Sequence, residues 1–325
     1  VYKGEFQYED RHGKGSLVCA DGSSYTGDYA LDRPHGFGHQ KYANGDEYKG
    51  EWQRGLRNGV GLFTYKSSAT YRGQWVDDLR QGHGVMKYAD GGMYTGDWHG
   101  DKRNGRGRHE YPPPSQDVYE GDVRVVRYVG TFAKDHLVGV GTIRTWDYSY
   151  EGDVVASLRH GEGVCKWANG DRYEGPWLED NRHGVGICTF ADGSRYNGTW
   201  VHDDMRGHTL RSYANGDRYM GVMLLGVPHG RGTYYRANGD EYDGEFVNGQ
   251  RHGFGIALFP SRHERYEGQW QDDAMHGRGK FLYEDHGAYE GEWQRGCRHG
   301  KGNMQYPDGE WYTGMWEDDM RHGWG

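Results

Sequence analysis

YKGEWQRGLRNGVGLFTY, residues 48–65 of this chain, returns with small changes as YEGEWQRGCRHGKGNMQY at residues 289–306. Both stretches begin with a Tyr that is followed two residues later by a Gly, and both place another Gly eleven residues after the Tyr. This pattern occurs fourteen times, with successive units 22 to 24 residues apart except for one longer gap. A regular period of about this length indicates a repeat architecture.

Residues alternate in character within each unit. In the first stretch, Tyr48, Gly50 and Trp52 are expected on one face of a β-strand, whereas Lys49 and Glu51 are expected on the other face. The second half of the unit alternates in the same way. Each unit therefore has the pattern of two strands, with one aromatic face and one charged face.

Short turn signals separate the units. Asn-Gly and Asp-Gly pairs tolerate positive φ and suit tight turns, and we expect the two halves of a unit to be joined by a connection that contains Arg57 or His276. The predicted fold class is all-β: an elongated, single-layer antiparallel meander of about fourteen stacked β-hairpins with a 23-residue period, forming a solenoid-like rod. The pairs are Asn44-Gly45, Asp90-Gly91, Asn169-Gly170, Asp192-Gly193, Asn215-Gly216, Asn238-Gly239 and Asp308-Gly309.

The composition indicates an unusual core. The 325 residues include 57 Gly, 27 Tyr and 12 Trp, while only 34% of the chain is hydrophobic. An aromatic ring from a neighbouring strand can lie over the vacant Cβ position of a glycine, so Gly and Trp on the same face are expected to complement each other. Aromatic rings thus replace an aliphatic core in the predicted fold.

The quoted units resemble MORN repeats (membrane occupation and recognition nexus), and the resemblance covers nearly the whole chain. The chain departs from the family pattern at Val154 and Met223, where an aromatic residue is expected, at Thr209, where a Gly is expected, and over the segment from Pro112 to Arg127. The resemblance implies a long array of the radial-spoke-head or cytoskeletal-scaffold type.

The repeat spacing predicts three parts. Residues 1–116 hold repeats 1–5, residues 117–127 are an insertion, and residues 128–325 hold repeats 6–14, the last of them incomplete. Three prolines next to the insertion cannot lie inside a central strand. We therefore expect a protruding loop or a short extra hairpin there, with a plain insertion favoured over a dedicated binding element.

Charge and hydropathy exclude several classes of function. The net charge of −9 disfavours nucleic acid and acidic membranes as partners. No apolar stretch approaches the roughly 20 residues that span a bilayer, and the first residues lack the features of a signal peptide. The four cysteines have neither metal-ligand spacing nor the density of a disulfide framework. We expect a soluble, cytoplasmic protein.

No constellation of residues indicates catalysis. Histidines recur at one position of the repeat, but equivalent positions lie about 9.5 Å apart in neighbouring units, too far for a shared zinc ion. Paired carboxylates such as Asp77-Asp78 are explained by turn polarity, and Cys165 and Cys188 are expected to be small core residues. We expect no enzyme activity, no catalytic residue, no cofactor and no metal in this segment, and a catalytic domain outside it is left open.

Two functions follow from the resemblance, because MORN families include cytoskeletal and ciliary organisers, radial-spoke-head proteins, junctional membrane proteins and regulatory parts of lipid kinases. The first is a structural scaffold or spacer for protein–protein interactions in a cytoskeletal or ciliary assembly, located in the cytoskeleton or in the axoneme of a cilium or flagellum. The alternative is a peripheral membrane or phosphoinositide-binding targeting array within a larger protein. The acidic charge favours the scaffold.

The aromatic face is the candidate protein-binding groove. A single sheet has no second layer, so we expect some rings to stay partly open and to bind helical segments or assembly subunits. The open strand edges are also expected to pair end to end in a homodimer. The candidate residues are Trp52, Trp75, Trp98, Trp177, Trp200, Trp270, Trp293 and Trp316.

Overall fold

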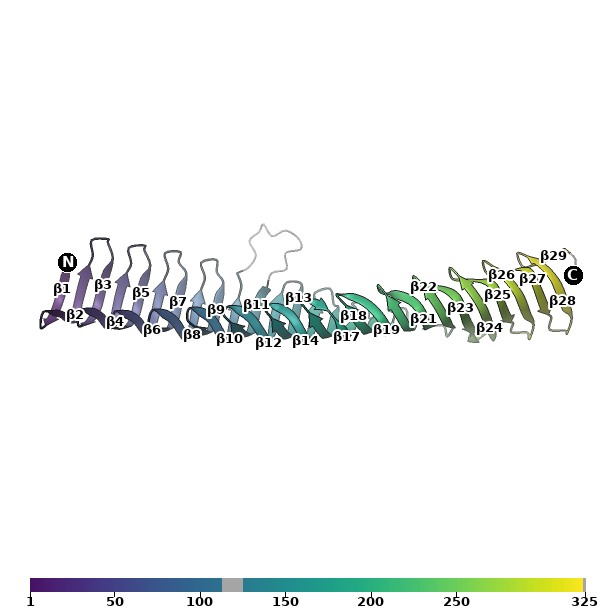
Figure 1. The fold of residues 1–325 in the computed structure, drawn as a ribbon, viewed down its shortest axis with the longest axis horizontal. Helices are drawn as coiled ribbons and strands as arrows, with labels where there is room; N and C mark the ends of the chain where they lie inside the picture. Colours follow the sequence, from purple (N-terminus) through teal and green to yellow (C-terminus); the bar gives the residue numbers. More distant parts are fainter. Residues whose placement is uncertain (113–124, 324–325) are drawn as a thin grey trace. The chain divides into compact units, whose positions relative to one another are not determined.

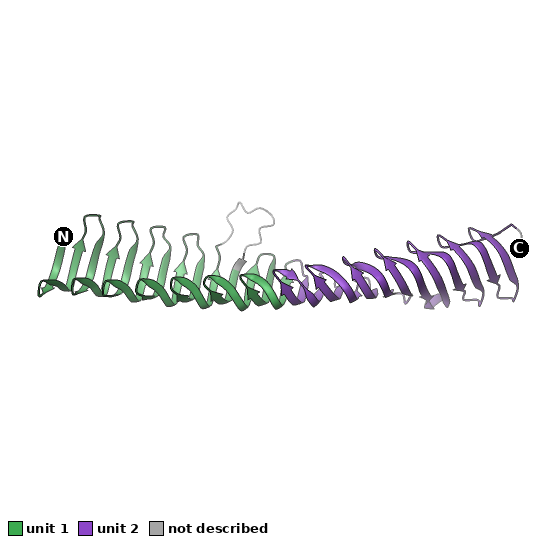
Figure 2. Ribbon diagram, viewed as in Figure 1, with its two compact units in different colours: residues 1–168 green, residues 169–325 purple. Residues whose placement is uncertain are grey.

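The computed structural model describes residues 1–112 and 125–323, and most of these residues lie in antiparallel β-strands. The chain divides into two compact units, residues 1–168 and 169–325 (Figure 2). Within each unit the strands follow one another in chain order and form a single layer (Figure 1). The described residues contain no α-helix. The predicted all-β antiparallel meander of hairpins is confirmed in each unit.

The described part of the first unit contains fourteen strands, and β1 to β13 each pair with the strand that follows. They are β1 (Tyr2–Gln7), β2 (Asp10–Val18), β3 (Ser24–Ala30), β4 (Arg33–Lys41), β5 (Glu47–Gln53), β6 (Leu56–Thr64), β7 (Thr70–Val76), β8 (Leu79–Lys87), β9 (Met93–His99), β10 (Lys102–Glu110), β11 (Val125–Ala133), β12 (His136–Thr145), β13 (Tyr148–Val155) and β14 (Leu158–Trp167).

The second unit has the same organisation, with one interruption and one 3-10 turn. Strand β15 pairs with both β16 and β17, and the break between these two lies opposite Pro176, which has no N–H to donate. The elements are β15 (Arg172–Leu178), β16 (Asn181–Arg182), β17 (Gly184–Thr189), β18 (Arg195–Val201), β19 (Asp204–Ser212), β20 (Arg218–Leu224), β21 (Val227–Tyr235), β22 (Glu241–Val247), β23 (Gln250–Phe259), η1 (Pro260–Arg262), β24 (Glu264–Gln271), β25 (Ala274–Leu282), β26 (Ala288–Gln294), β27 (Cys297–Gln305), β28 (Trp311–Glu317) and β29 (Met320–His322).

Two kinds of turn alternate along the meander. Inside a repeat, a two-residue turn has positive φ at both central residues, as at Asp77 (45°) and Asp78 (67°). Between repeats, the glycine of the Asn-Gly pair takes positive φ: Gly45 has a φ of 93° and donates its N–H to the carbonyl of Tyr42. The predicted role of the Asn-Gly pairs is confirmed.

The connection within a repeat differs from the sequence-based expectation. Arg57 belongs to β6 and pairs with Trp52 of β5, and His276 likewise lies within β25. The turn itself is formed by Arg54 and Gly55, both with positive φ. The prediction was wrong because a two-residue turn is shorter than the polar stretch from which the connection was inferred.

Glycines pair across neighbouring strands and form a row that we call the glycine ladder, for example Gly38, Gly50, Gly61 and Gly73. The ring of Tyr48 lies over two of them. A Cβ at Gly50 would come within 2.6 Å of the Tyr48 hydroxyl oxygen, and one at Gly61 would come closer still. A larger residue at Gly61 would displace the ring, and one at Gly50 would also meet the backbone Cα of Gly61 at 2.5 Å.

Tyrosine, rather than tryptophan, is therefore the residue that complements glycine. Tyr48 lies two residues before Gly50 on the same face of β5, so its ring can extend along the strand over the ladder. Its hydroxyl donates a hydrogen bond to the carbonyl of Glu51 at 3.0 Å, which fixes the ring. The expectation that tryptophan covers the glycines was wrong in this respect.

Tryptophan joins successive repeats instead. The Trp75 ring packs edge to face against Tyr48 of the preceding repeat and Tyr71 of its own, with centroid distances of 5.5 and 5.1 Å. The indole N–H of Trp52 donates to the carbonyl of Gly38 in the preceding repeat at 3.4 Å. Alternating Tyr and Trp rings thus connect neighbouring repeats, which is how a sheet without a second layer gains a core.

The departures from the repeat pattern fit the same core. Thr209 takes a ladder position, and its hydroxyl donates to the carbonyl of Asn197 at 2.9 Å. Val154 and Met223 are buried where the other repeats have Trp, Phe or Tyr. Cys165 and Cys188 are small buried core residues, as expected, and they pair across the sheet with Tyr150 and Tyr173.

The predicted insertion falls largely outside the described residues, which resume at Val125 with β11. The repeat that follows it has the common design, because the Tyr128 hydroxyl donates to the carbonyl of Thr131 at 3.3 Å and the ring lies over Gly130. The division into residues 1–116, 117–127 and 128–325 stays a prediction.

One buried histidine gives the fold a pH dependence. His109 pairs with Tyr94, at the position that Met86 takes in the preceding repeat. Burial, together with the Arg103 guanidinium, lowers the pKa of His109 to about 4. Its Nδ1 lies 2.8 Å from Nη1 of Arg103, which is the geometry of a neutral ring that accepts a hydrogen bond.

We expect the His109→Met variant to resist mild acid better than the unchanged protein. Unfolded histidine binds a proton near pH 6.5, so the stability that neutral His109 contributes is complete above that pH and falls as the pH drops towards 4. At pH 5 the loss is about 2 kcal/mol. Urea unfolding at pH 7.5 and 5.0 measures it, and an equal loss in both proteins would assign the effect to other groups.

Candidate functional site

The eight candidate tryptophans lie on one face of each sheet, which we call the aromatic face. The tyrosines whose rings lie over the glycine ladder, such as Tyr48, are on the same face. Their side chains are only 1–7% exposed, so the expectation that some of these rings stay partly open does not match the structure. Whether this face binds protein stays a prediction. The residues are Trp52, Trp75, Trp98, Trp177, Trp200, Trp270, Trp293 and Trp316.

An arginine covers many of these rings. The guanidinium carbon of Arg57 lies 4.3 Å from the centre of the Trp75 ring. Asp78 of the next repeat holds this arginine: its Oδ1 accepts from Nε at 2.8 Å and from the Arg57 backbone N–H at 2.9 Å, and its carbonyl accepts from Nη2. Arginine, ring and turn therefore form one inter-repeat contact, which explains why the indole is buried.

We call this arrangement of an arginine and a turn aspartate the arginine clamp. Sequence reasoning interpreted the paired aspartates as polar turn residues and missed it, although a spacing of 21 or 22 residues between Arg and Asp recurs in most pairs. The described residues include the clamps Arg11–Asp32, Arg57–Asp78, Arg80–Asp101, Arg103–Asp135, Arg182–Asp203, Arg251–Asp273 and Arg298–Asp319.

The clamps also set the electrostatics of the face. Burial alone would raise the pKa of Asp319, but the backbone N–H and guanidinium of Arg298 bring that pKa below its ordinary value. The carboxylate is therefore ionised at neutral pH and balances the arginine. The clamp arginines on the aromatic face are neutralised in this way, so they do not form a strip of unpaired positive charge.

The recurring histidines of the repeat do not converge on one site; their backbone carbonyls lie near tyrosine hydroxyls. The carbonyls of His160 and His183, for example, lie 3.3 and 3.4 Å from the hydroxyls of Tyr150 and Tyr173. Across residues 1–112 and 125–323, no three His, Cys, Asp or Glu side chains are grouped to hold a metal ion. The same residues include no helix with the length and apolar character to cross a membrane.

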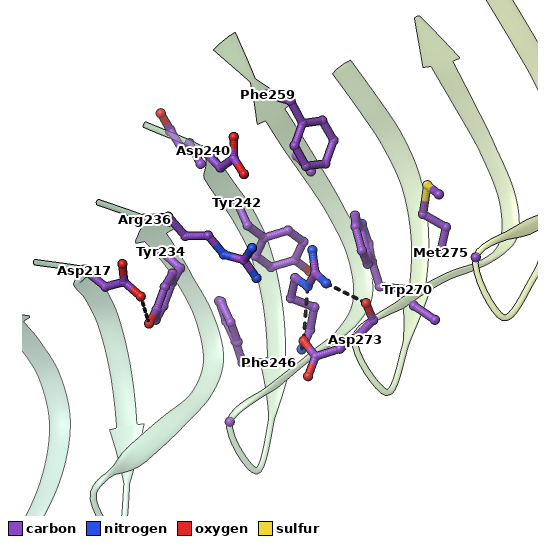
Figure 3. A pocket seen from close by; sticks show the side chains of 16 residues that line it. Asp217, Tyr234, Arg236, Asp240, Tyr242, Phe246, Phe259, Trp270, Asp273 and Met275 are labelled. Atoms are coloured by element: carbon purple, nitrogen blue, oxygen red, sulfur yellow. Dashed lines mark hydrogen bonds and ion pairs between the residues drawn. The ribbon is translucent and has the colours of Figure 1, made fainter. Parts of the chain in front are cut away.

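A hollow of about 770 Å³ opens on the aromatic face of the second unit (Figure 3). Tyr242, Phe246 and Trp270 are buried at its floor, and Phe259 lies at one end. Ala257 explains why the hollow is here, because it pairs with Tyr242 at a position that larger residues fill in most other repeats. Those residues are Phe63, Met86, Ile143, Tyr234, Phe281 and Met304.

Polar groups surround this hollow. The Tyr234 hydroxyl donates to Oδ2 of Asp217 at 2.8 Å, and burial followed by this hydrogen bond raises the pKa of Tyr234. Arg236 points into the hollow and Asp240 lies beside it (Figure 3). Arg251 lies over Trp270, with 4.2 Å between the guanidinium carbon and the ring centre. The site thus combines an aromatic floor with charges of both signs.

The MORN repeat model of known protein families matches thirteen segments that together cover most of the chain, and the chain belongs to the MORN-repeat family. This family comprises non-catalytic repeat arrays for protein interaction or membrane targeting. No curated protein matches the chain significantly. The matched segments are 2–24, 25–47, 48–70, 71–93, 94–113, 150–172, 173–195, 196–218, 219–241, 242–263, 266–288, 289–311 and 312–325.

Solved structures with some likeness include the TCP10 domain of Danio rerio CPAP in complex with a peptide of STIL, with 12% identity over 69% of this chain and 98% of that chain, at a TM-score of 0.36. The TCP domain of Drosophila melanogaster SAS-4 with a proline-rich motif of Ana2 shares 12% identity over 70% and 86% of the two chains, at a TM-score of 0.17. Likeness at this level carries no argument about function.

The Asp78→Asn variant should lower the stability of its repeat by about 1 kcal/mol, because it removes the charge that two hydrogen bonds of the clamp use. Asn tolerates positive φ, so the turn is retained. Asp77→Asn, which changes the neighbouring turn residue outside the clamp, is the control and should stay within about 0.5 kcal/mol. Hydrogen exchange of β6 and β7 measures both effects, and equal losses would contradict the role of the clamp.

Proposed function

We propose that this chain is a non-enzymatic scaffold whose aromatic face binds other proteins. The single layer of each sheet carries the proposal: arginines and neighbouring rings cover the aromatic face, and no second layer of described residues packs on it (Figure 2). Tyr, Trp and Arg are the residues that most often dominate protein–protein contacts. A face built from them along many repeats suits a partner that spans several repeats.

The charge distribution supports a protein partner over anionic lipid. Binding to phosphoinositides relies on clusters of unpaired Lys and Arg, whereas the clamp arginines of this face are each paired with an aspartate. The chain as a whole carries a net charge of −9. Both properties weaken electrostatic attraction to an acidic membrane surface.

We further propose that the scaffold belongs to a cytoskeletal or ciliary assembly, such as a radial spoke of the axoneme, and is located in the cytoplasm. Family analogy alone supports this step. The end-to-end homodimer, formed by pairing of open strand edges, stays a prediction. In the proposed scaffold the eight tryptophans, which arginines cover, stabilise the binding face and do not contact the partner directly.

A tagged copy of the complete gene product should concentrate on a cytoskeletal or ciliary structure. Tyr65→Glu, which places a charge on the aromatic face just after β6, should abolish this localisation. Val60→Glu is the matched control on the opposite face of the same strand, where Val60 is 53% exposed. Circular dichroism confirms the fold of both variants, and equal localisation of the two would contradict the aromatic face as the binding surface.

Vesicle sedimentation separates the scaffold from the membrane alternative. With vesicles of phosphatidylcholine, phosphatidylserine and phosphatidylinositol bisphosphate at physiological salt, the full chain should stay in the supernatant. Sedimentation with these vesicles but not with pure phosphatidylcholine, together with diffuse labelling of the plasma membrane, would overturn the proposal in favour of a lipid-targeting array.

A further inference from the structure

The face opposite the aromatic face concentrates positive charge in the first unit. Two rows of side chains cross the neighbouring strands β7 to β12 on this face (Figure 1). One row contains the residues that follow Tyr71, Tyr94 and Tyr128, the other contains the residues that precede them, and both include the cross-strand partners. The first row is Arg72, Val85, Thr95, Arg108, Val129 and Thr142, and the second row is Thr70, Lys87, Met93, Glu110, Arg127 and Arg144.

These two rows hold five basic side chains and a single carboxylate, that of Glu110. Glu110 forms an ion pair with Arg108. The other four basic side chains have no ion-pair partner among the described residues, and all but the half-buried Arg127 are exposed. We call this group the basic patch, and it consists of Arg72, Lys87, Arg108, Arg127 and Arg144.

The same two rows are balanced in the second unit. Across β15 to β28 they hold five basic and five acidic side chains. Several of these neutralise one another within the sheet, as Arg172 and Glu174 do at 2.7 Å. The basic patch is therefore a local feature of β7 to β12 and not a property of the repeat, and it lies on a chain whose net charge is −9.

Two arginines of the patch lie directly opposite each other. Arg127 of β11 pairs with Arg144 of β12. Like charges opposite each other on neighbouring strands destabilise a sheet, and no described carboxylate forms an ion pair with either arginine. An anionic group bound between the two guanidinium groups would remove this repulsion.

The dimensions of the patch select a narrow anionic occupant. Neighbouring strands lie ~4.8 Å apart and alternate residues of one strand ~6.8 Å apart, so the patch is about 24 Å long and two side chains wide. We propose that the basic patch binds an acidic segment of a partner protein, which lies along the two rows and places its carboxylates beside the basic side chains. Apolar residues of the segment pack on Val85 and Val129, which lie between the arginines of the first row.

The carboxylates around the patch disfavour a broad anionic surface such as a membrane. The first row continues into Glu151 on β13, and Asp97 of β9 lies on the same face, two residues from Thr95. A membrane over this face would meet these carboxylates together with the cations. A narrow segment meets chiefly the patch, because salt at physiological strength screens exposed charges beyond about 8 Å.

Fluorescence anisotropy with the full chain tests the proposal. The probe is a fluorescein-labelled peptide of repeated Glu-Leu-Asp-Glu units, and its neutral counterpart has Gln-Leu-Asn-Gln units. At low salt the acidic peptide should bind in a saturable way and at least tenfold more tightly than the neutral peptide. Raising the salt should weaken the acidic peptide and leave the neutral peptide nearly unchanged, because screening acts on the charges alone.

Two double variants with the same change in net charge locate the site. Lys87→Gln combined with Arg144→Gln should weaken the acidic peptide at least fivefold; both residues are exposed and outside the clamps, so the sheet should fold. Arg195→Gln combined with Arg218→Gln, in the second row of the other unit, is the matched control and should change the affinity less than twofold. Circular dichroism checks the fold of both variants.

Three results would overturn the proposal. Equal losses in the two double variants would place the peptide elsewhere, and equal binding of the acidic and neutral peptides would remove the role of charge. Sedimentation with phosphatidylserine vesicles that is lost in the Lys87→Gln, Arg144→Gln variant, without peptide binding, would assign the patch to a lipid surface.

This inference goes beyond the proposed docking function, because it concerns the other face of the sheet. Tyr65→Glu should leave the affinity for the acidic peptide unchanged, and Val60, which pairs with Gln74, lies outside both rows. If Tyr65→Glu and Val60→Glu localise equally while the acidic peptide still depends on Lys87 and Arg144, the aromatic docking face fails and the basic patch stands.

Discussion

The ring of a tyrosine over two paired glycines is the contact on which each repeat depends. A sheet with a charged opposite face and few aliphatic residues has no conventional core, and glycine alone would weaken its strands. The ring of Tyr48 packs against both glycines and offsets this loss, because only a residue without a Cβ leaves room for the ring at Gly50 and Gly61. The hydroxyl bond to the carbonyl of Glu51 then fixes the ring in place.

Everything else on the aromatic face builds on this contact. Tryptophan packs edge to face on the fixed tyrosines of two repeats, an arginine covers the tryptophan, and a turn aspartate of the next repeat holds the arginine. Each of these contacts reaches only to the neighbouring repeat, so the array is stabilised locally. The residue opposite the tyrosine is free to vary, and where it is reduced to Ala257 the face opens into a hollow.

The sequence was sufficient to predict the hairpins, their antiparallel order and the Asn-Gly turns, because period and alternation report directly on backbone geometry. It could not show that tyrosine covers the glycines or that Arg57 meets Asp78, since these contacts depend on side-chain direction between repeats and not on spacing within one. The burial of the eight tryptophans was missed for the same reason. The hollow at Ala257 became visible only when the pairing register aligned it with Phe281 and Met304.

Hydrogen exchange of the Gly84→Ala variant tests the central contact most directly. Gly84 has ordinary backbone angles, so the added methyl group conflicts chiefly with the Tyr71 ring. We predict that β7 to β9 exchange about 100-fold faster or more, equivalent to a loss of about 3 kcal/mol, while β1 to β4 are unchanged. Gly91→Ala, where φ is 93° and nothing lies within 4 Å, should cost only about 1–2 kcal/mol of backbone strain. Equal effects of the two substitutions would contradict the account.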